Sequence, residues 1–169
     1  MRHAETDWQR VNDRGWVGLA NDFAPLTERG RRQAEEASRS LAHARPAVLL
    51  TSPMTRALET AAIIGRRLGL DPIVEMDLRE WLPDRRLRWS SLVEVQRAYA
   101  AMLADAGEPG DGLPDWETMR EVRDRGLEAL RPYVAGKGHV LAVCHEVIIQ
   151  ALTGHPHTGA CELRPLSVV

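Results

Sequence analysis

The 169-residue sequence has only two cysteines, one phenylalanine and no long apolar run. Cys144 and Cys161 are too few for a disulfide framework and lack metal-ligand spacing. Reduced thiols are therefore the simpler interpretation, with a single bridge left open. No stretch is long and apolar enough to span a bilayer, and the first residues contain no signal-peptide core. We therefore expect a cytoplasmic protein without a membrane partner.

A large charge of either sign is also missing, because the formal net charge is −2. No global basic field would draw the protein to nucleic acid or to an anionic membrane, so any anion must bind at a local site. The composition, 44% hydrophobic and 27% charged, is that of a soluble globular protein. The length suits a single domain over residues 1–169.

Short apolar runs alternate with helical patterns along the chain, which predicts an α/β domain with a mainly parallel sheet. Strands are expected at 47–51, 72–76 and 139–144, with a last edge strand at 161–169. Helices are expected at 27–44, 53–68, 91–106, 117–135 and 146–152, the fourth broken or bent near Pro132.

Three other segments carry no sustained hydrophobic period. Residues 6–24 and 77–89 are expected to be surface loops, and long loops in compact domains tend to be functional. Residues 107–114 are rich in glycine and proline, which predicts a flexible connection.

Several residues typical of phosphate sites lie shortly after a predicted strand. In open α/β sheets, ligands bind beyond the carboxyl ends of the strands, so these residues are expected to converge. They are Ser52, Arg56, Glu80 and His145. His3 joins the group if a strand leads into it.

The residue types match what phosphoryl transfer needs. The transferring group spreads negative charge over three oxygens, so its site requires fixed cations and hydrogen-bond donors. Arg2 and Arg56 can supply bidentate guanidinium groups, and Arg56 falls in the first turn of a helix, where backbone N–H groups favour an anion. A neutral imidazole can attack phosphorus, which makes His3 the candidate nucleophile and His145 the second imidazole. Glu80 is the candidate general acid and base.

Three further residues are candidates for binding the phosphoryl group, namely Thr6, Asn12 and Ser52. Ser52 could also be interpreted as a nucleophile, but no His–Asp arrangement surrounds it in the sequence, so a phosphate-binding or helix-capping hydroxyl is the better role. Surface roles are assigned to the remaining histidines, which are His43, His139, His155 and His157. A run of arginines beside Glu80 predicts a solvated loop, with contact to a second substrate anion left open; its members are Arg79, Arg85, Arg86 and Arg88.

Five segments together resemble the histidine phosphatase superfamily, also called phosphoglycerate mutase-like proteins. They stand in the family's order and span nearly the whole chain. They are Arg2-His3-Ala4-Glu5-Thr6, the stretch 25–34 (PLTERGRRQA), the stretch 52–61 (SPMTRALETA), Leu78-Arg79-Glu80 and Val143-Cys144-His145. The resemblance implies a three-layer α/β/α sandwich, with His3 as phosphate acceptor and Glu80 as proton donor. Arg2, Arg56 and His145 would form the pocket, without metal or cofactor.

The function implied by this resemblance is a metal-independent phosphatase that hydrolyses a phosphomonoester of a small metabolite through a phosphohistidine. The chain is short, whereas the mutases of the family carry an inserted segment, so the phosphatase branch is the better match. Two alternatives stay open. One is a phosphohistidine protein phosphatase, although members of that kind lack the acid that Glu80 supplies here. The other is a catalytically impaired phosphate-binding or interaction protein of the same fold.

The match departs from the family at four places. Residues 81–89 lack the family's usual Gly-x-x-Glu-Gly pattern, so substrate contacts there cannot be carried over. Ala4 replaces the usual glycine, a small change. Glu146 follows the second histidine and would repel an anionic ligand, unless it points away or binds a cationic group of the substrate. Only Met1 precedes Arg2, so the first strand is truncated, although the family has a central strand there. We expect either upstream residues or another segment to fill that place. The candidates are residues 163–169 and a strand from a second copy, which leaves a homodimer open.

Overall fold

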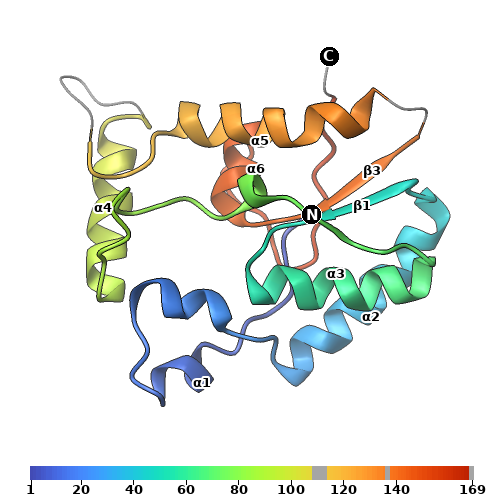
Figure 1. Ribbon diagram of the computed structural model, residues 1–169, viewed down its shortest axis with the longest axis horizontal. Helices are drawn as coiled ribbons and strands as arrows, with labels where there is room; N and C mark the ends of the chain where they lie inside the picture. Colours follow the sequence, from blue (N-terminus) through green and yellow to red (C-terminus); the bar gives the residue numbers. More distant parts are fainter. Residues whose placement is uncertain (108–113, 136–137, 168–169) are drawn as a thin grey trace.

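A parallel three-stranded sheet stands at the centre of the computed structural model, which describes residues 1–107, 114–135 and 138–167 (Figure 1). β1 (Val48–Thr51) lies between β2 (Ile73–Val74) and β3 (Val140–Val143). In the register, Leu50 is opposite Ile73 in β2 and Ala142 in β3. The strands expected at 47–51 and 139–144 are therefore confirmed, and the one expected at 72–76 is reduced to two residues.

Helices cover both faces of this sheet, which confirms the predicted α/β/α layering (Figure 1). On one face lie α2 (Glu28–Ala44) and α3 (Thr55–Leu68). On the other face lie α4 (Leu92–Ala104), α5 (Met119–Val134) and α6 (Glu146–Thr153).

Alternating side chains of the strands pack into two separate hydrophobic cores. Leu49 and Leu141 pack in one cluster with buried residues of α2 and α3. Leu50 packs in the other cluster with buried residues of α4, α5 and α6, among them Met102 and Ile148. Because a strand points successive side chains to opposite faces, a run of apolar residues is what a strand covered on both sides requires.

The helix ends follow local sequence signals. The Thr27 hydroxyl accepts a hydrogen bond from the backbone N–H of Gly30 and so caps the start of α2. Gly69, with φ +70°, ends α3 in the left-handed conformation that glycine adopts without strain. Thr118 and Glu121 form a capping box at the start of α5. Pro132 lies inside α5 without ending it.

The prediction of a loop over residues 6–24 is wrong in part. This segment contains a short helix, α1 (Trp8–Asn12), and a 3-10 helix, η1 (Gly18–Phe23). The Asp7 side chain accepts a hydrogen bond from the backbone N–H of Arg10 and caps α1. Elements this short are below the length at which a hydrophobic period becomes visible. In the other predicted loop, η2 (Met76–Leu78) precedes Glu80.

The edge strand expected at 161–169 is also wrong over residues 161–167, which form no strand. The cause is a turn, because Cys161 has a positive φ of 57° and the backbone N–H of Glu162 bonds back to the carbonyl of Gly159. Both cysteines are free thiols, so the bridge left open by the sequence does not form. The flexible connection expected at 107–114 falls mostly on residues 108–113, outside the described part of the chain.

The N-terminal residues lie beside the end of β3, where the sequence predicted a truncated strand. Arg2 forms an isolated parallel bridge with Cys144, whose backbone N–H donates to the carbonyl of Met1 at 2.9 Å. On the outer side, the backbone N–H of Arg2 donates to the carbonyl of Glu162 at 3.2 Å. Of the candidate segment 163–169, residues 163–167 form no strand, and residues 168–169 lie outside the described part of the chain. This single bridge directs His3 to the carboxyl edge of the sheet.

In the described ranges, no helix has the length and apolar character needed to cross a membrane.

Candidate active site

The predicted histidines and Ser52 lie together at the carboxyl edge of the sheet. Ser52 directly follows β1, and His145 is the second residue after β3. His3 follows the bridge that the N-terminal segment makes with the end of β3, and its ring centroid is 5.1 Å from that of His145. Side chains that follow neighbouring parallel strands share one edge, and this geometry unites residues far apart in sequence.

His3 is buried and held in one orientation by its own backbone. Its Nδ1 is 2.7 Å from the carbonyl oxygen of Ala4, which only accepts, so Nδ1 carries the proton and Nε2 keeps its lone pair. The Thr6 hydroxyl lies 3.4 Å from the same Nδ1. Burial, helped by the Arg56 charge, lowers the pKa of His3 to about 3. His3 is therefore a neutral imidazole with a free nitrogen at physiological pH.

His145 occupies the residue position before α6, without a capping hydrogen bond from its side chain, and is fully buried. Its Nε2 is 2.7 Å from the Ser52 hydroxyl oxygen, and that hydroxyl also accepts a hydrogen bond from the backbone N–H of Met54 at 3.3 Å. Among the described residues, its Nδ1 has no hydrogen-bond partner. Burial and the nearby Arg56 charge lower the pKa of His145 well below the ordinary value for histidine.

Arg56 is a buried cation with unused donors. It lies in the first turn of α3 with only 5% of its surface exposed, and its Nε and NH1 have no hydrogen-bond partner among the described residues. The carboxylate of Asp22 is 3.6 Å from NH1, and the ring of Trp8 lies 5.3 Å from the guanidinium carbon. Unsatisfied donors on a buried charge are unfavourable, so an anion that accepted hydrogen bonds from Nε and NH1 would stabilise this side chain.

Arg2 is engaged by neighbours from the C-terminal part of the chain. Its NH1 donates to the carbonyl of Thr158 at 2.7 Å and pairs with the Glu146 carboxylate at 2.9 Å. Glu146 also contacts Nδ1 of His157 at 2.5 Å. The carboxylate that the sequence marked as repulsive is thus bound to a cation of the site itself.

Glu80 lies in the loop after η2, and backbone N–H groups hold both of its oxygens. Its Oε1 accepts from Trp81 at 3.0 Å and its Oε2 from Val147 at 3.5 Å. Burial raises the pKa of Glu80, and the Arg56 charge opposes this only in part. A raised pKa favours the protonated form of the carboxyl group, which is the form that a general acid needs.

A clamp from α5 fixes the backbone around Glu80. NH1 of Arg125 donates to the carbonyl oxygens of Asp77 at 2.5 Å and Arg79 at 2.9 Å, and NH2 donates to that of Glu80 at 3.3 Å. Arg125 also pairs with the buried carboxylate of Glu117, Nε to Oε1 at 2.6 Å. A planar guanidinium with five donors can hold several carbonyls of one loop at once.

Most of the arginine run beside Glu80 is paired within the protein. Arg79 contacts Asp77 and Glu117, Arg85 contacts Glu121, and Arg88 contacts Asp84. These pairs favour the structural interpretation of the run over contact with a substrate anion.

Of the predicted phosphate-binding residues, Thr6 and Ser52 lie beside the two histidines, but Asn12 does not. Asn12 is exposed at the last position of α1, where its carbonyl accepts from Gly15. The sequence reasoning missed Asp22, because only the folding of η1 brings that carboxylate to Arg56.

Within the described residues, no group of three or more His, Cys, Asp and Glu side chains is arranged to hold a metal ion.

Comparison with known proteins gives one family. A model of the histidine phosphatase superfamily (branch 1) matches residues 1–162. The chain is 32% identical to the uncharacterized phosphatase PhoE of Bacillus subtilis, over 100% of this chain and 81% of that relative. It is 30% identical to the glucosyl-3-phosphoglycerate phosphatase of Mycolicibacterium vanbaalenii, over 90% and 70% of the two chains. It is 32% identical to the probable phosphoglycerate mutase GpmB of Cronobacter sakazakii, over 77% of this chain but only 59% of that relative.

Solved structures agree with the sequence relatives. Mycobacterial glucosyl-3-phosphoglycerate phosphatase superposes with a TM-score of 0.68 and 28% identity, over 90% of this chain and 75% of the other. YhfR of Bacillus stearothermophilus superposes with a TM-score of 0.66 and 29% identity, over 89% and 74%.

Proposed function

The chain belongs to branch 1 of the histidine phosphatase superfamily, and from that membership we propose that it hydrolyses a phosphomonoester of a small metabolite through a phosphohistidine on His3. It is thus a phosphoric monoester hydrolase, like the relatives named as phosphatases. The relatives support only a class of substrate, small phosphorylated metabolites. One of them is named as a glucosyl-3-phosphoglycerate phosphatase.

The observation that carries the proposal is the state of His3. Its Nδ1–H is bound to the carbonyl of Ala4, which leaves the Nε2 lone pair available, and the low pKa keeps the ring neutral. The partly unpartnered guanidinium of Arg56 and the ring of His145 lie close by. A neutral imidazole beside a fixed cation is what attack on a phosphoryl group requires.

In the first step, Nε2 of His3 attacks phosphorus, and the bond from phosphorus to the ester oxygen breaks. Glu80 gives its proton to the departing oxygen, so an alcohol leaves. Arg2, Arg56 and His145 bind the phosphoryl oxygens as their negative charge shifts.

In the second step, the carboxylate of Glu80 takes a proton from water while the water oxygen attacks phosphorus. The bond from phosphorus to nitrogen breaks, inorganic phosphate leaves, and His3 returns to its neutral form. Glu80 ends protonated, ready for the next cycle.

One observation favours the impaired, phosphate-binding alternative. Glu146 pairs with Arg2 at 2.9 Å, so a phosphate ion must compete with a carboxylate for that guanidinium. The phosphohistidine protein phosphatase alternative has less support, because a phosphoramidate nitrogen leaves easily and needs no acid, whereas Glu80 is held beside the site.

The test is hydrolysis of 4-nitrophenyl phosphate in the presence of EDTA. We expect wild type to turn over and to form an acid-labile phosphoenzyme. His3→Ala should lose activity by a factor of about 10³ or more. His43→Ala, which removes an exposed histidine of α2, is the matched control and should retain activity. No turnover by wild type that still binds phosphate would favour the impaired alternative.

A further inference from the structure

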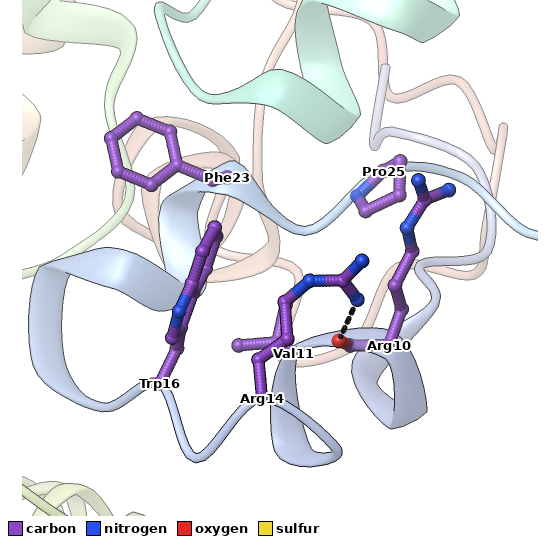
Figure 2. Close-up of a pocket in the computed structure, with 6 residues that line it drawn as sticks. All are labelled: Arg10, Val11, Arg14, Trp16, Phe23 and Pro25. Carbon is purple, nitrogen blue, oxygen red and sulfur yellow. Dashed lines mark hydrogen bonds between the residues drawn. The ribbon is translucent and has the colours of Figure 1, made fainter.

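A cavity of about 300 Å³ opens between α1 and η1, beside the site but outside the machinery described above. Figure 2 shows the side chains that line it, with the Trp16 and Phe23 rings at one side and the two arginine side chains at the other. They are Arg10, Val11, Arg14, Trp16, Phe23 and Pro25. This volume is at the lower end of the range for small-molecule pockets.

The two arginines bring positive charge that the described part of the protein leaves unpaired. Neither Arg10 nor Arg14 forms an ion pair among the described residues; NH1 of Arg14 only donates to the carbonyl of Arg10 at 2.8 Å. The nearby carboxylates are engaged elsewhere: Asp7 caps α1, Asp13 accepts from Gln9, and Asp22 pairs with Arg56. In a chain of net charge −2, two adjacent unpaired guanidinium groups suit an anionic ligand.

The opposite wall is aromatic and exposed. Trp16 and Phe23 have 43% and 65% of their surface exposed, although their rings meet edge to face with centroids 6.2 Å apart. The guanidinium carbon of Arg14 lies 5.9 Å from the Trp16 ring. A ligand that covered these rings would remove apolar surface from water while its anion met the arginines.

The walls of the cavity continue from residues that touch the phosphate site. Phe23 follows Asp22, which pairs with Arg56, and α1 begins with Trp8, whose ring lies over Arg56. The carbonyl of Pro25 accepts from the backbone N–H of Asp7, four residues after His3. A substrate with its phosphoryl group at His3 would therefore meet this cavity with its other end.

We propose that the cavity receives the non-reacting end of the substrate, and that this end carries a second anionic group on an apolar or aromatic body. The carboxylate or phosphate binds Arg10 and Arg14, and the body rests on Trp16 and Phe23. This inference rests on the proposed phosphatase function and names the class of substrate for the same site.

The experiment compares three substrates: 4-nitrophenyl phosphate, 4′-carboxybiphenyl-4-yl phosphate and biphenyl-4,4′-diyl bisphosphate. For each of the two biphenyl compounds, which carry a second anionic group, the quantity measured is its kcat/KM divided by kcat/KM for 4-nitrophenyl phosphate. In the double variant Arg10→Met/Arg14→Met, this ratio should fall about tenfold or more, mainly through KM. Comparison of the ratios for the carboxylate compound and the bisphosphate shows which second anion the arginines prefer.

The matched control is Arg66→Met/Arg67→Met, which removes the same charge from exposed positions in the last turn of α3. It should keep the wild-type ratio. An equal ratio in wild type and the Arg10/Arg14 double variant, with both proteins folded by circular dichroism, overturns the inference and leaves the phosphatase function standing. If wild type hydrolyses none of the three compounds, the proposed function fails, and the inference fails with it.

Discussion

At the scale of single residues, the two imidazoles are kept neutral by burial and by the guanidinium groups around them. The pKa of His3 falls to about 3, and that of His145 is lowered as well, because both rings are desolvated and face the Arg56 charge. A nucleophile gains from this arrangement, since protonation would remove its lone pair. The same shift also links the folding stability to pH.

Stability should fall as the pH falls from about 6.5 toward about 3. In that range an unfolded His3 binds a proton and the folded one does not, so protons favour the unfolded state. For His3 alone the free energy of unfolding should be lower by about 2 kcal/mol at pH 5 than at pH 7.5. Urea unfolding of wild type and His3→Asn at the two pH values measures this.

The difference between these two proteins isolates His3, because Glu80, whose raised pKa acts in the opposite sense, is present in both. His43→Asn removes an exposed histidine, so its free energy of unfolding should fall between the two pH values as much as that of wild type. An equal fall in the free energy of unfolding of wild type and His3→Asn would show that His3 is not buried in neutral form.

The Arg2–Glu146 pair predicts a second single-residue effect. Glu146→Gln removes a carboxylate 2.9 Å from the Arg2 guanidinium, so inorganic phosphate should inhibit with a constant about two- to fivefold lower at low salt. Glu128→Gln, on the exposed face of α5, is the control and should leave the inhibition constant as it is. Weaker phosphate binding in Glu146→Gln would mean that the carboxylate instead holds Arg2 in place.

At the scale of elements, α5 acts on the site through a loop. Arg125 reaches from the middle of α5 to three carbonyl oxygens around Glu80 and is itself held by Glu117. The orientation of Glu80, the proposed acid, therefore depends on α5.

Loss of this clamp should show in the dependence on the leaving group. In Arg125→Met, kcat for an alkyl phosphate, which needs the acid, should fall about tenfold more than kcat for 4-nitrophenyl phosphate. The alkaline limb of the pH profile of kcat for the alkyl phosphate, where Glu80 loses its proton, should move as well, and Arg125→Lys should restore part of the loss. Arg131→Met, an exposed arginine of the same helix, is the control.

Because Arg125→Met removes one of the two arginines that pair with the buried Glu117, the double variant Arg125→Met/Glu117→Gln keeps the test open if the single variant fails to fold. A proportional loss on both substrates, with an unmoved pH profile, would contradict a positioning role for Arg125.

Most regular elements could be predicted because their signals are local. The apolar runs at 47–51 and 139–144 and the Thr27 cap depend on neighbours in sequence, and the structure confirms them. The wrong predictions have non-local causes. The segment 161–167 is turned by the positive φ of Cys161 and is held by the N-terminal residues, and neither feature has a period in the sequence.

The residues of the candidate site also divide into those that could be predicted from the sequence and those that could not. The strand-end rule brings His3, Ser52 and His145 together, because topology alone sets that edge. The pairing of Arg56 with Asp22 and of Arg2 with Glu146 could not be predicted, because each depends on how a turn directs a side chain. Asn12 fails for the same reason, since the short helix α1 turns it to the surface.

At the scale of the whole molecule, two hydrophobic cores share one narrow sheet. Leu49 and Leu50 are neighbours in β1 but belong to opposite cores, so neither core can come apart without exposing the strand that serves the other. We therefore still predict a single folding domain over residues 1–169. A homodimer and a cytoplasmic location also stay predictions.

Thermal unfolding should then be one cooperative transition. Far-UV circular dichroism and tryptophan fluorescence, which reports on indoles in several parts of the chain, should give the same midpoint. Inorganic phosphate at about 100 times its dissociation constant should raise the stability by about 2.7 kcal/mol in both signals. Two separated transitions, or a shift in only one signal, would contradict a single domain.

The two free thiols have a consequence for the conditions under which this protein works. Cys144 stands next to His145, yet burial raises its pKa, and burial raises the pKa of Cys161 to about 11. Peroxide and alkylating reagents attack the thiolate, which neither residue supplies near neutral pH. With a nitrogen nucleophile, as proposed for His3, treatment with peroxide that inactivates an enzyme with a sulfur nucleophile should leave this protein active.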